Sequence, residues 1–135
     1  MPYLALITVL ALLQFLYFGI QVGRARGRYA VPAPATTGNE HFERHFRVQM
    51  NTLELLAMFL PALWLFGSYI SAIWAAALGA VFIIGRGLYA MGYVKEPNKR
   101  SLGYALSILP TLALLIGVGI WAIRALFVEG VSPQQ

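Results

Sequence analysis

The side chains that could do chemistry in this chain lie near the ends of long apolar stretches. Arg47, Asn51 and Glu54 recur at i, i+4 and i+7, which places all three on one face of a helix. Glu54 lies a full turn inside an apolar stretch, where a carboxylate is costly, and we expect it to be buried beside a cation. This face is therefore expected to point away from lipid and toward a pocket.

A second polar face has the same character. Arg86, Tyr89 and Tyr93 recur at i, i+3 and i+7 near the end of another apolar stretch. Arg26, where the first stretch ends, and Arg100, where the last one begins, lie at the same level. All four stretches could thus contribute to one polar pocket at a membrane edge.

The residue types in this group favour a small peptide-like anion as ligand. Arginine binds carboxylates in a bidentate manner, a glutamate suits an ammonium group, and Gln49 and Asn51 suit amides. Glutathione has all of these groups, and it brings a thiol to a chain that has no cysteine. Arg100 is the best candidate to stabilise the thiolate, because a guanidinium at a helix start favours ionised sulfur.

Each of these residues also has a simpler interpretation. Arg26 could serve only to orient the chain in a membrane, with its head group at the interface. Arg47 could form a local ion pair with Glu43 or Glu54 along its own helix. Tyr89 and Tyr93 could belong to an aromatic belt at the membrane surface. The joint arrangement is what favours a binding site.

The composition excludes most water-soluble proteins. The chain has 135 residues, of which 59% are hydrophobic and only 11% charged, whereas a soluble domain has about 25% charged residues. The absence of cysteine excludes disulfides, thiolate metal sites and a cysteine nucleophile. His41 and His45 have no second set of ligands beside them, so we expect no metal site.

Four apolar stretches are each long enough to cross a bilayer as a helix. They cover about residues 3–22, 50–67, 70–93 and 102–127. The sequence therefore predicts an all-α integral membrane protein, a single domain over residues 1–135 with an up-down four-helix bundle. The first stretch has no basic segment before it and is interpreted as a membrane span, not a signal peptide.

The connections between the spans differ in length. Residues 23–49 are rich in arginine, with prolines and a glycine at their centre, and are expected to form a loop or extended connector instead of a helix. A tight hairpin is expected near Gly67 and Ser68. The third connection, residues 94–100, is short and basic, and Pro97 suits the first turn of the last helix.

Charge distribution predicts the orientation of the chain. Ten basic residues stand against five acidic ones, and all the basic residues except Arg124 lie in or beside the first and third connections. The positive-inside rule places these connections in the cytoplasm and both termini on the outer or lumenal side. Because the basic residues lie at membrane ends and not in a basic soluble module, nucleic acid is not expected as a partner.

The order of these residues resembles a known family. The pattern runs Thr36-Thr37-Gly38, Phe42-Glu43-Arg44, Arg47-x-Gln49-x-Asn51-x-x-Glu54, Arg86-x-x-Tyr89-x-x-x-Tyr93 and Arg100. As a composite it resembles the signature of the membrane-associated proteins in eicosanoid and glutathione metabolism, the MAPEG family. The resemblance covers about 80 residues from Gln21 onward, with matching hydropathy on both sides.

The resemblance implies a homotrimer with a glutathione site at each subunit interface, open sideways to membrane lipid. The positions that resemble the glutathione-binding set are Arg26, Arg47, Gln49, Asn51, Glu54, Arg86, Tyr89 and Tyr93. Arg100 resembles the arginine that stabilises the thiolate. Two departures, Gly27 and Leu55, set the chain apart from the cysteinyl-leukotriene synthase branch and favour a general or bacterial-type glutathione transferase.

The expected function is therefore the attack of glutathione thiolate on a lipophilic electrophile or lipid hydroperoxide, with peroxidase activity as a possible companion reaction. The main alternative is a non-catalytic lipid-binding or scaffold member of the same family, against which the retained polar set argues. A small four-span multidrug transporter is a third hypothesis. Such transporters need a charged site near the membrane midplane, and the first span here has no charged residue.

Overall fold

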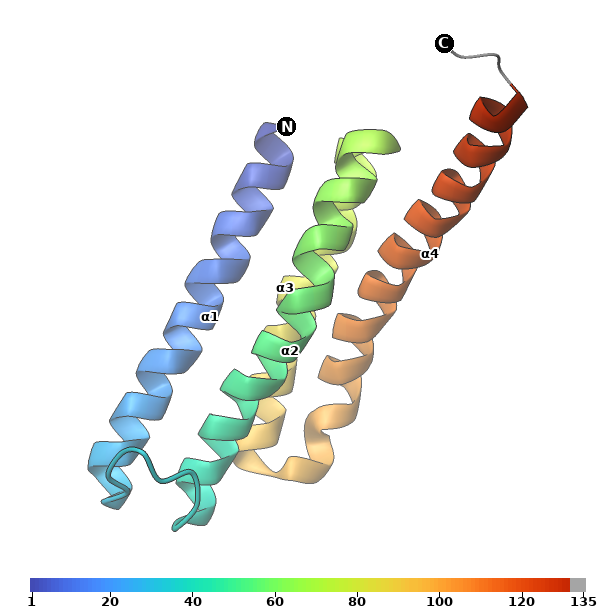
Figure 1. The fold of residues 1–135 in the computed structure, drawn as a ribbon. Coiled ribbons are helices and arrows are strands. Elements are labelled where there is room, and N and C mark those ends of the chain that lie inside the picture. Colours follow the sequence, from blue (N-terminus) through green and yellow to red (C-terminus); the bar gives the residue numbers. More distant parts are fainter. Residues whose placement is uncertain (132–135) are drawn as a thin grey trace.

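Four long helices make up the computed structural model, which describes residues 1–131 (Figure 1). They are α1 (Pro2–Tyr29), α2 (Glu40–Tyr69), α3 (Ala72–Lys95) and α4 (Ser101–Val131), with a short 3₁₀ helix, η1 (Pro97–Arg100), before α4. Each of the four is long and apolar enough to cross a membrane. The predicted all-helical, four-span architecture is confirmed.

Successive helices run in opposite directions. The N-terminus and the end of α4 lie at one end of the bundle, and the loop after α1 and the η1 connection lie at the other (Figure 1). Both α1 and α4 pack against α2 and α3, which occupy the centre. The up-down order is as predicted, and it brings the two basic connections to the same end of the molecule.

The connector predicted over residues 23–49 is wrong at both of its ends. The structure continues α1 to Tyr29 and begins α2 at Glu40, so only residues 30–39 are non-helical. The reason is local, because arginine is a good helix former and the prolines that break the helix are confined to the middle of this segment. Ala30 ends α1 in the left-handed conformation, with φ of 56°.

Asn39 begins α2 as its N-cap. Its Oδ1 accepts hydrogen bonds from the backbone N–H groups of His41 at 2.9 Å and Phe42 at 3.1 Å. His41 and His45 consequently lie on α2, and not in a loop as the sequence suggested.

The two short connections differ slightly from their predicted form. The hairpin between α2 and α3 falls at Ile70 and Ser71, a few residues after the predicted position, and the Ser71 hydroxyl caps α3 by accepting from Trp74 N at 3.2 Å. Pro97 opens η1 and not α4 itself. The tight antiparallel turn is otherwise as expected.

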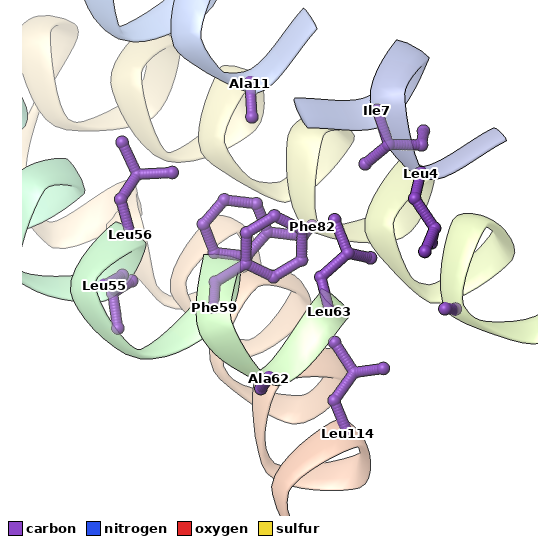
Figure 2. Close-up of a cluster of buried hydrophobic side chains, with 11 residues drawn as sticks. Leu4, Ile7, Ala11, Leu55, Leu56, Phe59, Ala62, Leu63, Phe82 and Leu114 are labelled. Carbon is purple, nitrogen blue, oxygen red and sulfur yellow. The ribbon is translucent and has the colours of Figure 1, made fainter. Parts of the chain in front are cut away.

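Apolar side chains from all four helices fill the centre of the bundle (Figure 2). Phe59 of α2 and Phe82 of α3 stack face to face, with ring centroids 3.8 Å apart and planes 3° apart. Around them lie Leu4, Ile7, Ala11, Leu55, Leu56, Ala62, Leu63, Ala75 and Leu114. Such van der Waals packing holds helices together in lipid, where the hydrophobic effect does not.

The outward faces of the flanking helices are also apolar. Leu13 and Leu16 of α1 and Ile116 and Leu126 of α4 are more than half exposed in the single chain. An exposed surface of this kind in four helices of spanning length fits a multi-pass membrane protein.

Candidate functional site

Arg86 holds three helices together at the end of the bundle that carries the basic connections. Its Nε donates to Ser107 Oγ of α4 at 2.9 Å. Its Nη1 donates to Asn51 Oδ1 at 2.7 Å and to Thr52 Oγ1 at 3.1 Å, both on α2. The Arg86 side chain therefore sets the relative positions of α2, α3 and α4 at this level.

The guanidinium of Arg86 is completely buried, with 0% of its surface exposed. It lies 4.4 Å from the ring centroid of Tyr89, a favourable cation–π distance. Within residues 1–131 its hydrogen-bond acceptors are all neutral oxygens, and its Nη2 has no acceptor. The site is thus built over a buried positive charge that no carboxylate of the described chain neutralises.

Two glycines allow α3 and α4 to approach closely around Arg86. A Cβ at Gly103 would lie 2.1 Å from Tyr89 N, and a Cβ at Gly85 would lie 2.6 Å from the carbonyl carbon of Leu106. Contacts this short are with backbone, which cannot move aside as a side chain can. Glycine is required at both positions for the helices to keep their spacing.

A polar hollow of about 400 Å³ opens beside the contact between α3 and α4. It is lined by Arg47 and Asn51 of α2, Tyr89 and Tyr93 of α3, Arg100 of η1 and Tyr104 of α4.

The wall of this polar hollow combines aromatic rings with guanidinium groups. Tyr89 and Tyr93 stack with ring centroids 5.5 Å apart, and Tyr104 is tilted against Tyr89 at 6.4 Å. The guanidinium carbon of Arg100 lies 6.0 Å from the Tyr93 ring centroid. Two of the predicted polar faces and Arg100 therefore meet in one place.

Glu54 is placed differently from its prediction. Its carboxylate is not buried in the single chain, since 59% of the side chain is exposed. Its Oε1 lies 3.9 Å from Nη2 of Arg47, whose side chain is 52% exposed, so the simpler interpretation of Arg47 as part of a local pair also holds. Arg47 lines the polar hollow, whereas Glu54 does not.

Arg26 and Gln49 do not line the polar hollow in a single chain. Arg26 donates to the carbonyl oxygens of Val31 at 3.3 Å and Ala35 at 2.7 Å, and so ties the end of α1 to residues 30–39. Gln49 lies on the side of α2 that faces α1, where its Nε2 is 3.1 Å from the position of a Cβ at Gly19. The expectation that all four helices contribute to the hollow is not met within one chain.

Three residues of the site escaped the sequence prediction. Tyr104 lines the polar hollow, and Thr52 and Ser107 bind Arg86. Arg100, Tyr104 and Ser107 recur at i, i+4 and i+7, so the spacing rule that found the other two faces could have found this one. Thr52 had no comparable signal, because a buried threonine in an apolar helix is common.

The arrangement can bind an anion. Arg47 and Arg100 supply cations, and no carboxylate lines the hollow. The Asn51 oxygen is already used by Arg86, so its amide N–H groups remain for a ligand, and the tyrosine hydroxyls can donate as well. No group of three or more metal-binding side chains occurs among residues 1–131.

Fold and site together define a multi-pass membrane protein with a polar hollow, lined by two arginines, at one end of a four-helix bundle. The MAPEG family model matches residues 4–120. The chain therefore belongs to the MAPEG family.

Several relatives align over most of the chain. An uncharacterized protein of Synechocystis is 53% identical over 125 residues, which are 90% of this chain and 91% of that protein. Microsomal glutathione S-transferase 2 of Homo sapiens is 44% identical over 119 residues, 87% of this chain and 81% of that enzyme. Leukotriene C4 synthase of Cavia porcellus is 40% identical over 97 residues, 72% of this chain and 65% of that enzyme.

Proposed function

We propose that this protein is an integral-membrane glutathione transferase and that glutathione binds in the polar hollow. The observation that carries the proposal is the meeting of Arg47, Arg100 and the amide of Asn51 in a hollow without a carboxylate. Those groups match the carboxylates and amides of a small anionic peptide. The similarity to microsomal glutathione S-transferase 2 supports the same ligand.

In the proposed reaction, Arg100 stabilises the thiolate of glutathione. The thiol releases its proton to water, and the guanidinium favours the ionised sulfur near neutral pH, where a free thiol with a pKa of about 8.5 is mostly protonated. The sulfur then forms a bond to an electrophilic carbon, and the leaving group departs with the bonding electron pair. The electrophile is lipophilic and reaches the sulfur sideways from the bilayer.

The same thiolate could reduce a lipid hydroperoxide. In that reaction the hydroperoxide becomes an alcohol and water, and two glutathione molecules become the disulfide. The rings of Tyr89, Tyr93 and Tyr104 lie beside the cations that line the hollow. Peroxidase activity is therefore proposed beside conjugation.

The complete site is proposed to form between subunits of a homotrimer. Arg26 and Gln49 lie away from the polar hollow, and the Arg47–Glu54 pair is exposed on a helix of spanning length. An exposed ion pair at that position is costly in lipid but not against a second polar surface. A neighbouring chain that presents its own Arg26 and Gln49 to this face would bring the whole predicted set together.

The first and third connections are proposed to lie in the cytoplasm, where glutathione would enter. The connections and the adjoining helix ends carry nine of the ten basic residues, and the positive-inside rule assigns such segments to the cytoplasm. Both termini would then lie on the outer or lumenal side.

Substitution of Arg100 tests the reaction. Arg100→Ala should leave the protein folded and able to bind glutathione while conjugation falls about a hundredfold, as for loss of one preorganised charge-stabilising group. The matched control is Arg124→Ala, which removes an arginine from the far end of α4. Conjugation and peroxidase turnover, glutathione binding and the ultraviolet absorbance of the thiolate are measured on the purified protein, and light scattering gives its oligomeric mass.

Unchanged turnover in Arg100→Ala would refute the role of this residue. If the wild-type protein binds lipid, but neither binds glutathione nor shows the absorbance of its thiolate, the non-catalytic lipid-binding alternative would be supported instead.

A further inference from the structure

A second pair of hollows lies between α1, α2 and α3, away from the polar hollow. The inner one, of about 170 Å³, is mostly apolar, and its lining includes Tyr17 and Gln21 of α1, His45 of α2 and Ala90 of α3. The outer one, of about 300 Å³, is lined by Gln21, Arg24, Ala25, Arg28, Tyr29 and His45. Gln21 and His45 line both hollows, so the two are adjacent and together make one path along α1.

The path changes character along the helix. Tyr17, Gln21, Arg24 and Arg28 recur at i, i+4, i+7 and i+11, so they form a single stripe on α1 that runs from aromatic to amide to cationic. The cationic part lies in the last turns of α1, at the end of the bundle where the helix leaves the apolar region. The order of groups along the stripe matches that of a lipid in one leaflet, with the acyl chains at the aromatic end and the head group at the cationic end.

The cations at the outer hollow lack an acidic partner. Neither Arg24 nor Arg28 pairs with a carboxylate anywhere in residues 1–131, and no acidic residue lines either hollow. Arg28 lies 5.5 Å from the ring centroid of Tyr29, and the His45 ring adds a polar group from α2. The positive charge at the outer hollow is complementary to an anion.

We propose that this path binds an anionic phospholipid, with the head-group phosphate at Arg24, Arg28 and His45 and part of one acyl chain in the inner hollow. The phosphodiester of a phospholipid carries one negative charge on two non-bridging oxygens, and each oxygen can accept from one of two arginines one turn apart. The inner hollow is smaller than the roughly 300–1,000 Å³ of a small-molecule pocket, which suits one chain and not a compact ligand.

The site is independent of the polar hollow. None of its lining residues belongs to the set proposed for glutathione, and Arg26 lies on a different face of α1 from Arg24 and Arg28 because successive residues are turned by about 100°. Lipid binding can therefore be tested whether or not the protein proves to be a transferase.

The test is native mass spectrometry of the purified full-length protein in neutral detergent. The probes are phosphatidylglycerol, phosphatidylcholine with the same acyl chains, and oleate. We expect phosphatidylglycerol to bind in preference to phosphatidylcholine. Arg24→Gln and Arg28→Gln should each lower its affinity about fivefold and together about thirtyfold, as expected for arginines that attract an anionic head group.

Two further variants test the position of the acyl chain. Ala90→Phe should fill the inner hollow and lower the affinity for phosphatidylglycerol, and its control, Ala80→Phe, adds the same side chain to an exposed position of α3 and should not. Arg124→Gln is the charge control, because it removes an arginine at the opposite end of the bundle. Size-exclusion elution establishes that each variant is folded.

Several results would overturn the proposal. Equal binding of the two phospholipids would mean that Arg24 and Arg28 only hold the helix end at the interface. Oleate binding that is as tight and equally arginine-dependent would assign the site to fatty acids. An equal loss in Arg124→Gln would indicate a general charge effect, and lipid binding confined to dissociated single chains would indicate that a second copy covers this face.

Discussion

Gly103 is the position where a single methyl group should disturb both the fold and the site. In Gly103→Ala the new Cβ would lie 2.1 Å from Tyr89 N and 2.4 Å from Tyr89 Cα, both backbone atoms of α3. Ordinary van der Waals contact begins at 3.4 Å, so α3 and α4 would have to separate by about 1.3 Å. Neither helix can avoid this by a change of rotamer.

Moving α3 and α4 apart would lower the stability of the folded protein. Ser107 lies one turn after Gly103, and a shift of that size would break its 2.9 Å hydrogen bond from Arg86. Overpacking of a well-packed contact costs about 1–3 kcal/mol, and we expect the upper part of this range because the clash is with backbone. For a chain of this length the loss corresponds to a fall in melting temperature of about 10 °C.

The assay is thermal unfolding in detergent, followed by circular dichroism, together with glutathione conjugation. The matched control is Gly119→Ala in the same helix, where an added Cβ has nothing within 4 Å. That variant should be as stable as the wild type or up to about 1 kcal/mol more stable, since alanine is the better helix former. Equal melting temperatures for the two variants would refute the close contact between α3 and α4.

Two other substitutions test the ties around the site and the start of α2. Arg86→Lys keeps the charge but loses the planar guanidinium, so the side chain cannot reach Ser107 and Asn51 together. The protein should lose about 1–3 kcal/mol of stability and bind glutathione more weakly. An unchanged melting temperature would contradict this role of Arg86. Asn39→Ala removes the acceptor for two backbone N–H groups and should cost about 1 kcal/mol, which Asn39→Ser should largely restore, as measured by thermal unfolding.

The sequence was sufficient to predict the spans and their order. Four apolar stretches of spanning length admit few structures in a bilayer, and short connections force neighbouring helices to be antiparallel. The helix ends were less predictable. Arginine flanks at 24–28 and 44–47 continue as helix, because loss of hydropathy marks the end of a membrane span and not the end of a helix.

The site was predictable where one helix face carried the whole signal. Arg47 and Asn51, and likewise Tyr89 and Tyr93, follow from helical spacing alone, and the structure brings both pairs to the polar hollow. Burial was not predictable. Arg86 is buried between three helices, whereas the Glu54 side chain is exposed. The difference arises because burial depends on how each helix is rotated and on contacts beyond one chain.

The unneutralised charge of Arg86 has a kinetic consequence. A buried cation surrounded by neutral oxygens projects a positive potential through the low-dielectric end of the bundle, and Arg100 adds to it at the polar hollow. Anions approaching from water are therefore drawn toward this end before any contact forms. Their association rate should fall as salt shortens the Debye length, which is about 10 Å at 0.1 M, while dissociation changes far less.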